Sequence, residues 1–84
     1  MIEPAEVERL LRARFSDAQL ELVDLTGTQD HYQARIVSSA FAGKSLIEQH
    51  QLVYGALGVA MRGAIHALAL KTFTPDAWAK INGA

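Results

Sequence analysis

The chain has 84 residues, of which 50% are hydrophobic and 20% are charged. This composition excludes a disordered chain, and the length suits one modest hydrophobic core, so we expect a single domain over residues 1–84. Eight Lys and Arg against nine Asp and Glu give a formal net charge of −1, and cysteine is absent. The charge balance disfavours nucleic-acid binding, and the lack of cysteine excludes disulfides and thiolate chemistry from this chain.

The sequence contains no signal for a membrane or a secretory route. No apolar run approaches the roughly 18 residues needed to cross a bilayer. The N-terminal sequence MIEPAEVERLL carries acidic residues where a signal or transit peptide carries basic ones. We therefore expect a cytoplasmic protein, or a mature organellar one, with no membrane partner.

The first part of the chain is expected to form a helix and two strands. Proline suits a first helical turn, and the apolar spacing after it predicts a helix over Pro4–Phe15. Strands are predicted over Leu20–Leu25 and over residues 31–39, joined by the turn-rich sequence TGTQD. Strands joined this closely should be antiparallel neighbours, which puts His31 at the loop end of the second strand, facing outward.

A second helix is expected after the connecting sequence SSAFAGKS, which can contain a short helical turn. Ser45 opens this helix, and Glu48 three residues later completes a capping-box pattern. Gly63 is expected to end it in the left-handed conformation. The residues predicted to form its buried stripe are Ile47, Tyr54, Leu57 and Met61.

The third strand is predicted in AIHALALKTF, followed by a short helix that Thr74 caps, with Pro75 at its first position and Trp78 packing back. The element order becomes αββ(α)αβα. Because a helix separates the second and third strands, these strands should be parallel, with a right-handed crossover. The predicted fold class is α+β, a three-stranded mixed sheet covered by helices on one face.

Three histidines are the candidate functional side chains, and each also has a structural explanation. His66 shares the strand parity of Leu68 and Leu70, so it fits a hydrogen-bonded histidine at a strand edge as well as a ligand. His31 fits either a solvated turn residue or a ligand, and His50 fits a packing residue at the core margin. No serine, carboxylate or glycine motif forms a catalytic set, so we expect no enzyme activity. The residues alone indicate a compact α+β binding module.

Three blocks of the sequence resemble the BolA family: HYQARIVSSAFAGKS, HQLVYGAL and, most specifically, IHALALKTFTPDAW. The resemblance covers nearly the whole chain and implies a fold similar to a class II KH domain. It also implies a non-enzymatic adaptor in iron–sulfur cluster handling or iron and redox signalling. Such an adaptor would share a [2Fe-2S] cluster with a monothiol glutaredoxin and glutathione. The residues that match the family's cluster ligands are His66, in the Ile-His-Ala block, and His31, in the loop between the first two strands.

The composition is consistent with this implied partnership. A chain without cysteine cannot hold such a cluster alone, so the isolated chain is expected to bind no cofactor and to be a monomer or weak homodimer. Two imidazoles could complete a cluster whose thiolates come from glutaredoxin and glutathione, as imidazole replaces thiolate in Rieske centres.

The family also includes proteins described as DNA-binding transcriptional regulators, which gives an alternative: a KH-like nucleic-acid-binding regulator. Candidate contacts are Lys44, His50 and Lys71. The segment that reads Arg-His-Arg in many members reads EQHQ here, at residues 48–51, and no KH-type Gly-x-x-Gly clamp is expected. Any DNA binding should therefore be weak and unspecific.

Overall fold

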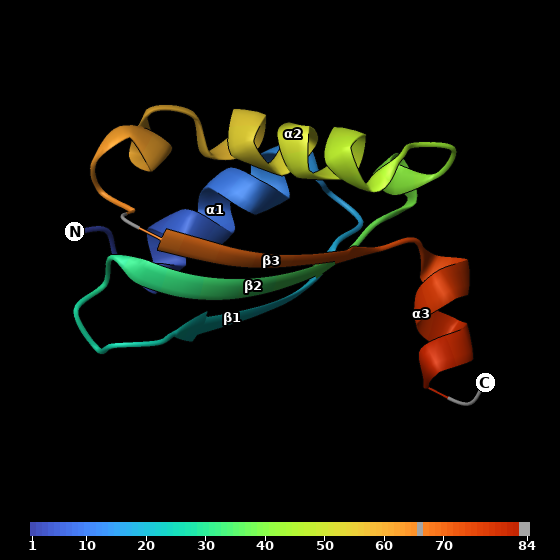
Figure 1. Ribbon diagram of the computed structural model, residues 1–84, viewed down its shortest axis with the longest axis horizontal. Coiled ribbons are helices and arrows are strands. Elements are labelled where there is room, and N and C mark those ends of the chain that lie inside the picture. The colour runs from blue at the N-terminus through green and yellow to red at the C-terminus, as the bar shows by residue number, and fades with distance from the viewer. Residues whose placement is uncertain (66, 83–84) are drawn as a thin grey trace.

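The computed structural model describes residues 1–65 and 67–82. Within these residues, three strands form one mixed sheet in the order β1-β2-β3, and helices α1 and α2 lie over one of its faces (Figure 1). This arrangement confirms the predicted α+β fold. None of the helices in this part of the chain is long and apolar enough to cross a membrane.

Helix α1 spans Pro4–Arg14, one residue less than predicted. It begins at proline because the first helical position needs no N–H donor and the ring already fixes a helical φ. Its buried residues, Val7 and Leu11, lie one turn apart on the face toward the sheet. Phe15, directly after the helix, packs on Phe41 with 5.2 Å between ring centroids.

Strand β1 spans Gln19–Asp24 and pairs antiparallel with β2, which spans His31–Val37. Strand β3 spans Ala67–Phe73 and runs parallel to β2. Both strand orientations agree with the predictions. A close turn returns the chain beside β1, whereas a parallel partner requires a crossover, which α2 supplies.

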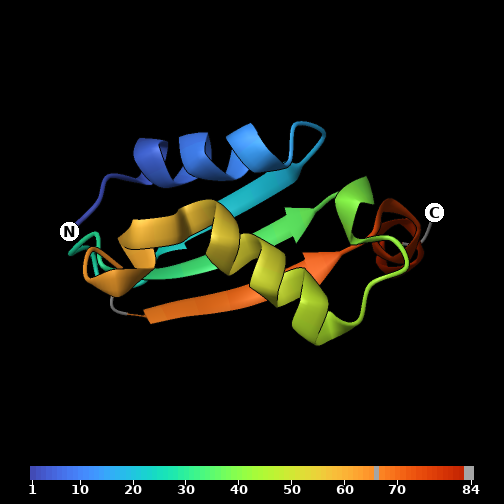
Figure 2. The same ribbon diagram turned by 90° about the horizontal axis from the view of Figure 1, so that it is seen from above.

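The two faces of the sheet differ in burial, and β2 shows the contrast most clearly. Tyr32, Ala34 and Ile36 are buried beneath the helices. Seen from above, α1 lies over β1 and α2 crosses β2 and β3 (Figure 2). The intervening residues of β2, His31, Gln33 and Arg35, are only partly buried. This second face, which α1 and α2 leave uncovered, is called the open face below.

Helix α2 spans Leu46–Leu57, and the predicted capping box is present. Glu48 N–H donates to the Ser45 hydroxyl over 3.2 Å, and Ser45 N–H donates to the Glu48 carboxylate over 2.8 Å. The helix therefore begins where the sequence indicated, because both partners lie within one turn of each other.

The predicted buried stripe of α2 is partly wrong. Leu57 is 1% exposed, but Ile47 and Tyr54 are 72% and 42% exposed. The buried face instead follows Val53 and Leu57, one turn apart, while Met61 is half-buried beyond the helix. Apolar residues occupy several faces of α2, so contact with the sheet decides which face is buried.

Helix α2 also ends earlier than predicted. Its last residue is Leu57, and Gly58 follows with a φ of 54°, a left-handed conformation that glycine adopts without a Cβ clash. A 3-10 helix, η2, continues over Gly58–Arg62. Gly63 has a φ of −171° and does not end the helix. The short turn expected in the preceding connection is present as η1, Ser39–Phe41.

Helix α3 spans Pro75–Ile81 and begins as predicted, with Ala77 N–H donating to the Thr74 hydroxyl over 3.2 Å. Trp78 packs back on Phe73 with 5.1 Å between ring centroids. The Arg35 guanidinium lies 4.4 Å from the centroid of the Trp78 ring, a cation–π contact. This helix does not join the layer of α1 and α2 but lies beyond the end of β3, toward the open face (Figure 1).

Candidate functional site

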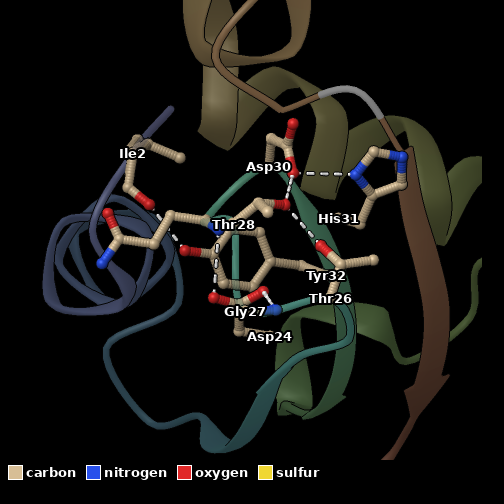
Figure 3. Close-up of polar contacts among 9 residues, drawn as sticks. Ile2, Asp24, Thr26, Gly27, Thr28, Asp30, His31 and Tyr32 are labelled. Carbon is tan, nitrogen blue, oxygen red and sulfur yellow. Dashed lines mark hydrogen bonds and ion pairs between the residues drawn. The ribbon is translucent and has the colours of Figure 1, made fainter.

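His31 is the first residue of β2, directly after the β1–β2 loop. Its side chain is 40% exposed, and its Nδ1 lies 2.8 Å from Oδ1 of Asp30 (Figure 3). The predicted placement at the loop end of the strand, with the side chain reaching solvent, is confirmed. The imidazole is thus both oriented by a neighbour and accessible from outside.

The β1–β2 loop that carries Asp30 is held by a second carboxylate. Asp24 accepts the backbone N–H of Gly27 over 3.0 Å and that of Gln29 over 3.1 Å. The Thr28 hydroxyl donates to Oδ1 of Asp30, the same oxygen that faces His31. In these contacts, N–H and hydroxyl groups of the loop donate to the carboxylates of Asp24 and Asp30 (Figure 3).

The N-terminal segment also forms hydrogen bonds with this loop and with the start of β2. Ile2 N–H donates to the Gln29 carbonyl over 2.9 Å, and the Tyr32 hydroxyl donates to the Ile2 carbonyl over 2.6 Å. Burial raises the pKa of Tyr32, and the nearby carboxylates of Asp24, Asp30 and Glu3 raise it further. The Tyr32 phenol therefore stays protonated and donates the hydrogen bond that links the N-terminal segment to β2.

The start of β3 meets the same end of the sheet. Ala67 pairs in register with His31, and Ala67 N–H donates to the Asp30 carbonyl over 3.2 Å. His66, the predicted principal ligand, precedes Ala67 in the sequence but lies outside the described residues. Over residues 1–65 and 67–82, no three His, Cys, Asp or Glu side chains form a group able to hold a metal ion.

The three residues considered for nucleic-acid contact do not all lie on one face of the fold. Lys44 lies exposed in the connection before α2, and Lys71 is exposed on β3, in register with Arg35 of the open face. His50 is half-buried on α2, and its Nε2 is buried with no hydrogen-bond partner among the described residues. The partial burial agrees with the predicted position at the core margin and makes His50 a poor phosphate contact.

The chain contains one Gly-x-x-Gly sequence, although no KH-type clamp is expected. Gly55, Ala56, Leu57 and Gly58 have this spacing, at the junction of α2 and η2. Leu57 is fully packed in the core, however, and only one basic residue, Arg62, follows within η2. A KH clamp grips the backbone of several nucleotides, so this segment lacks the surrounding charge that such a grip needs.

A surface groove of about 490 Å³ lies between the N-terminus, α1 and the end of α2. Its walls are mainly apolar, and the Glu6–Arg9 ion pair contributes its polar portion. The groove is lined by Met1, Ile2, Glu6, Arg9, Leu10, Leu57, Val59, Ala60 and Ala64. Among the described candidates, His31, Lys44, His50 and Lys71 are not part of this lining.

Sequence reasoning missed two carboxylates that organise this molecule. Asp30 orients His31, and only its adjacency to a histidine could have drawn attention to it. Asp17 accepts hydrogen bonds from the Ser38 hydroxyl over 2.7 Å, from Ser39 N–H over 2.9 Å and from the Ser39 hydroxyl over 2.6 Å. The Ser39 and Ser38 hydroxyls, with the Ser39 N–H, lower the pKa of Asp17 to about 2. No local pattern reveals this link, because its partners are distant in sequence.

Two relatives illustrate the sequence similarity of the chain. An uncharacterised protein of Rickettsia prowazekii is 37% identical over 73 residues, covering 87% of this chain and 95% of the relative. The DNA-binding transcriptional regulator BolA of Escherichia coli is 33% identical over 79 residues, covering 86% and 75%.

Solved structures of other proteins have the same fold. A Bol-like protein from Babesia bovis superposes with a TM-score of 0.88 at 35% identity, covering 98% of this chain and 95% of that chain. The BolA domain of SufE1 from Arabidopsis thaliana gives 0.80 at 28% identity, covering 90% and 98%. Yeast Fra2 gives 0.73 at 26% identity, covering 96% and 87%.

The family model for BolA-like proteins matches residues 11–77. This stretch extends from the middle of α1 into α3 and includes the β1–β2 loop and the whole sheet. The chain is therefore a member of the BolA-like protein family.

Proposed function

We propose that this chain is a non-enzymatic adaptor that shares a [2Fe-2S] cluster with a monothiol glutaredoxin and glutathione. The cluster would be the cargo or signal that passes between the partners. His66 and His31 would be the ligands from this chain. The isolated chain would then hold no cluster, because the remaining ligands come from elsewhere.

The single observation that carries the proposal is the register between His31 and Ala67. Ala67 directly follows His66 in the sequence. The parallel pairing of β2 with β3 therefore brings the segment after one candidate ligand alongside the other. The Ala67–Asp30 backbone hydrogen bond supports the same closeness.

The chemistry of the donor set fits a shared cluster. The chain has no cysteine, and iron–sulfur clusters accept histidine in place of some thiolates. The His31 imidazole is partly exposed at the edge of the sheet, where a partner can approach it.

The neutral imidazole is the form that binds iron, so the role of the protein is to present that form in a fixed orientation. The contacts of Asp24, Thr28 and Ile2 hold the loop that directly precedes His31. A ligand oriented before binding loses less conformational freedom when the complex forms.

The test is a titration of a cluster-loaded monothiol glutaredoxin with this chain, followed by visible circular dichroism. Replacement of thiolate by imidazole changes the electronic environment of iron, so the spectrum should shift and saturate at a fixed ratio of the two proteins. A second titration, with cluster-free glutaredoxin and size-exclusion chromatography, separates protein association from ligation. An unchanged cluster spectrum at saturating chain would contradict the proposal.

The name of the Escherichia coli relative, a DNA-binding transcriptional regulator, favours nucleic-acid binding as a second candidate. Lys71 lies on the open face of the sheet, opposite α2, which carries His50, so the candidate residues do not form one contact surface. The net charge of −1 limits the strength of any DNA binding.

A further inference from the structure

We propose that Asp30 is a positioning residue that holds the neutral imidazole of His31 as the Nδ1–H tautomer and so makes Nε2 the metal-binding nitrogen. The inference deepens the proposed function and rests on it for the identity of the metal. The orientation of the ring, by contrast, can be measured on the chain alone.

The geometry assigns the proton on the ring. Nδ1 of His31 lies 2.8 Å from Oδ1 of Asp30, which is hydrogen-bond distance. A carboxylate accepts hydrogen bonds and donates none, so the ring nitrogen that faces it must carry the hydrogen. In a neutral imidazole the other nitrogen, Nε2, then keeps its lone pair. Nε2 is on the side of the ring away from Asp30 (Figure 3).

Asp30 itself is held in place, which a positioning residue requires. Its Oδ1 also accepts from the Thr28 hydroxyl, and its backbone carbonyl accepts from Ala67 N–H over 3.2 Å. Its side chain is 20% exposed, compared with 40% for His31. The more buried carboxylate can therefore act as a fixed support behind the more exposed imidazole.

Metal-binding histidines commonly donate their second ring N–H to a carboxylate, which fixes the tautomer and increases the basicity of the ligating nitrogen. Loss of such a carboxylate typically weakens metal affinity by about 10–100-fold. The Asp30–His31 pair has the arrangement that this effect needs. The Asp30–His31 pair lies at the end of the sheet where β3 begins with Ala67.

The experiment is long-range ¹H–¹⁵N NMR of the isolated ¹⁵N-labelled chain at alkaline pH. The His31→Ala variant identifies the His31 signals. In the wild-type chain, we expect a protonated Nδ1 and an unprotonated Nε2. In Asp30→Asn, we expect this preference to disappear, because an amide can both donate and accept.

Asp24→Asn is the matched control. Asp24 lies at the start of the same loop and accepts hydrogen bonds from the N–H groups of Gly27 and Gln29, not from the His31 ring. The control should therefore keep the wild-type tautomer even if the loop loosens. A wild-type ring protonated on Nε2, a wild-type tautomer in Asp30→Asn, or the same change in both variants would overturn the inference.

A second readout separates this inference from the proposed function. With cluster-loaded glutaredoxin, Asp30→Asn should weaken formation of the mixed cluster by about 10–100-fold, while Asp24→Asn should weaken it less. If wild-type chain leaves the glutaredoxin spectrum unchanged, the proposed function fails, but the positioning of His31 by Asp30 stands on the tautomer measurement. Equal cluster affinity for wild type and Asp30→Asn would overturn the role of Asp30 in metal binding.

Discussion

Ala67 N–H donates to the Asp30 carbonyl over 3.2 Å, which joins the start of β3 to the end of the β1–β2 loop. The bond belongs to the backbone, so it does not depend on the side chain of either neighbouring histidine. Substitution of His31 or His66 should therefore leave the pairing of β2 with β3 intact. This independence makes it possible to test ligand function without losing the fold.

The hydrogen bond from Tyr32 to Ile2 is expected to stabilise the fold measurably. Tyr32→Phe keeps the buried ring and removes the hydroxyl that donates over 2.6 Å to the Ile2 carbonyl. The free energy of unfolding should fall by about 1 kcal/mol, a typical value for one hydrogen bond. Urea denaturation measures this change.

Tyr54→Phe is the control for this substitution, because Tyr54 is 42% exposed. Its effect should remain within about 0.5 kcal/mol, as for most surface changes. Equal losses in both variants would mean that the Tyr32–Ile2 bond contributes nothing specific.

The two faces of α2 should respond differently to truncation. Leu57→Ala removes a side chain that is 1% exposed and should lower the free energy of unfolding by about 2–5 kcal/mol through cavity formation. Ile47→Ala, at a position 72% exposed, should change it by less than about 0.5 kcal/mol. Thermal unfolding of both variants checks this contrast. A large loss of stability in Ile47→Ala would contradict the exposed position of Ile47 and favour the buried position that its spacing predicted.

Because of Asp17, the free energy of unfolding should decrease at low pH. Its serine partners lower its pKa from 3.8 to about 2 in the folded state. The stabilisation is therefore complete above the unfolded value, near pH 4, and disappears as the pH falls through about 2. Asp17→Asn should lose less stability than the wild type over that interval, as measured by denaturant unfolding at a series of pH values.

Ser39→Ala provides an intermediate case for the same measurement. It removes the hydroxyl bond of 2.6 Å but keeps the Ser38 hydroxyl and the backbone N–H as donors to Asp17. Its pH dependence should lie between those of the wild type and Asp17→Asn. A slope in Asp17→Asn identical to the wild type would assign the acid sensitivity to other groups.

Duplex DNA binding should be weak at physiological salt. The chain carries a net charge of −1, and its two candidate lysines lie on different parts of the fold. We expect a dissociation constant in the unspecific range of about 10⁻⁴–10⁻⁶ M by fluorescence anisotropy, with little dependence on sequence. A sequence-specific value near 10⁻⁸ M, typical of regulators, would favour the alternative function.

Short-range patterns predicted the beginnings of the helices. Pro4 at the start of α1, the Ser45–Glu48 capping box and the Thr74 cap each act within one turn, so the sequence contains the whole interaction. The order of the strands followed from connection length. The outward face of α2 could not be predicted in the same way, because Ile47 and Val53 are both apolar and only the sheet distinguishes them.

The site was only partly predictable for a related reason. The placement of His31 at a loop end followed from strand alternation, but no pattern in the sequence showed that the Asp30 carboxylate would face the His31 ring. The hydrogen bond between Asp17 and Ser38 joins the segment before β1 to the segment after β2, which lie side by side because the two strands pair. Such contacts depend on the folded arrangement and have no local signature.

The measurement that tests the central claim most directly compares three chains, each added to cluster-loaded monothiol glutaredoxin and observed by visible circular dichroism. The wild type should give a shifted spectrum and His66→Ala should give none. His31→Ala should give a weaker or altered spectrum, because water or another group can take the vacant position while His66 still binds. Far-ultraviolet circular dichroism should show all three folded. An unchanged spectrum with the wild type would contradict the shared-cluster function. If His66→Ala unfolds while His31→Ala shifts the cluster spectrum as the wild type does, both histidines are structural, and their assignment as cluster ligands is contradicted.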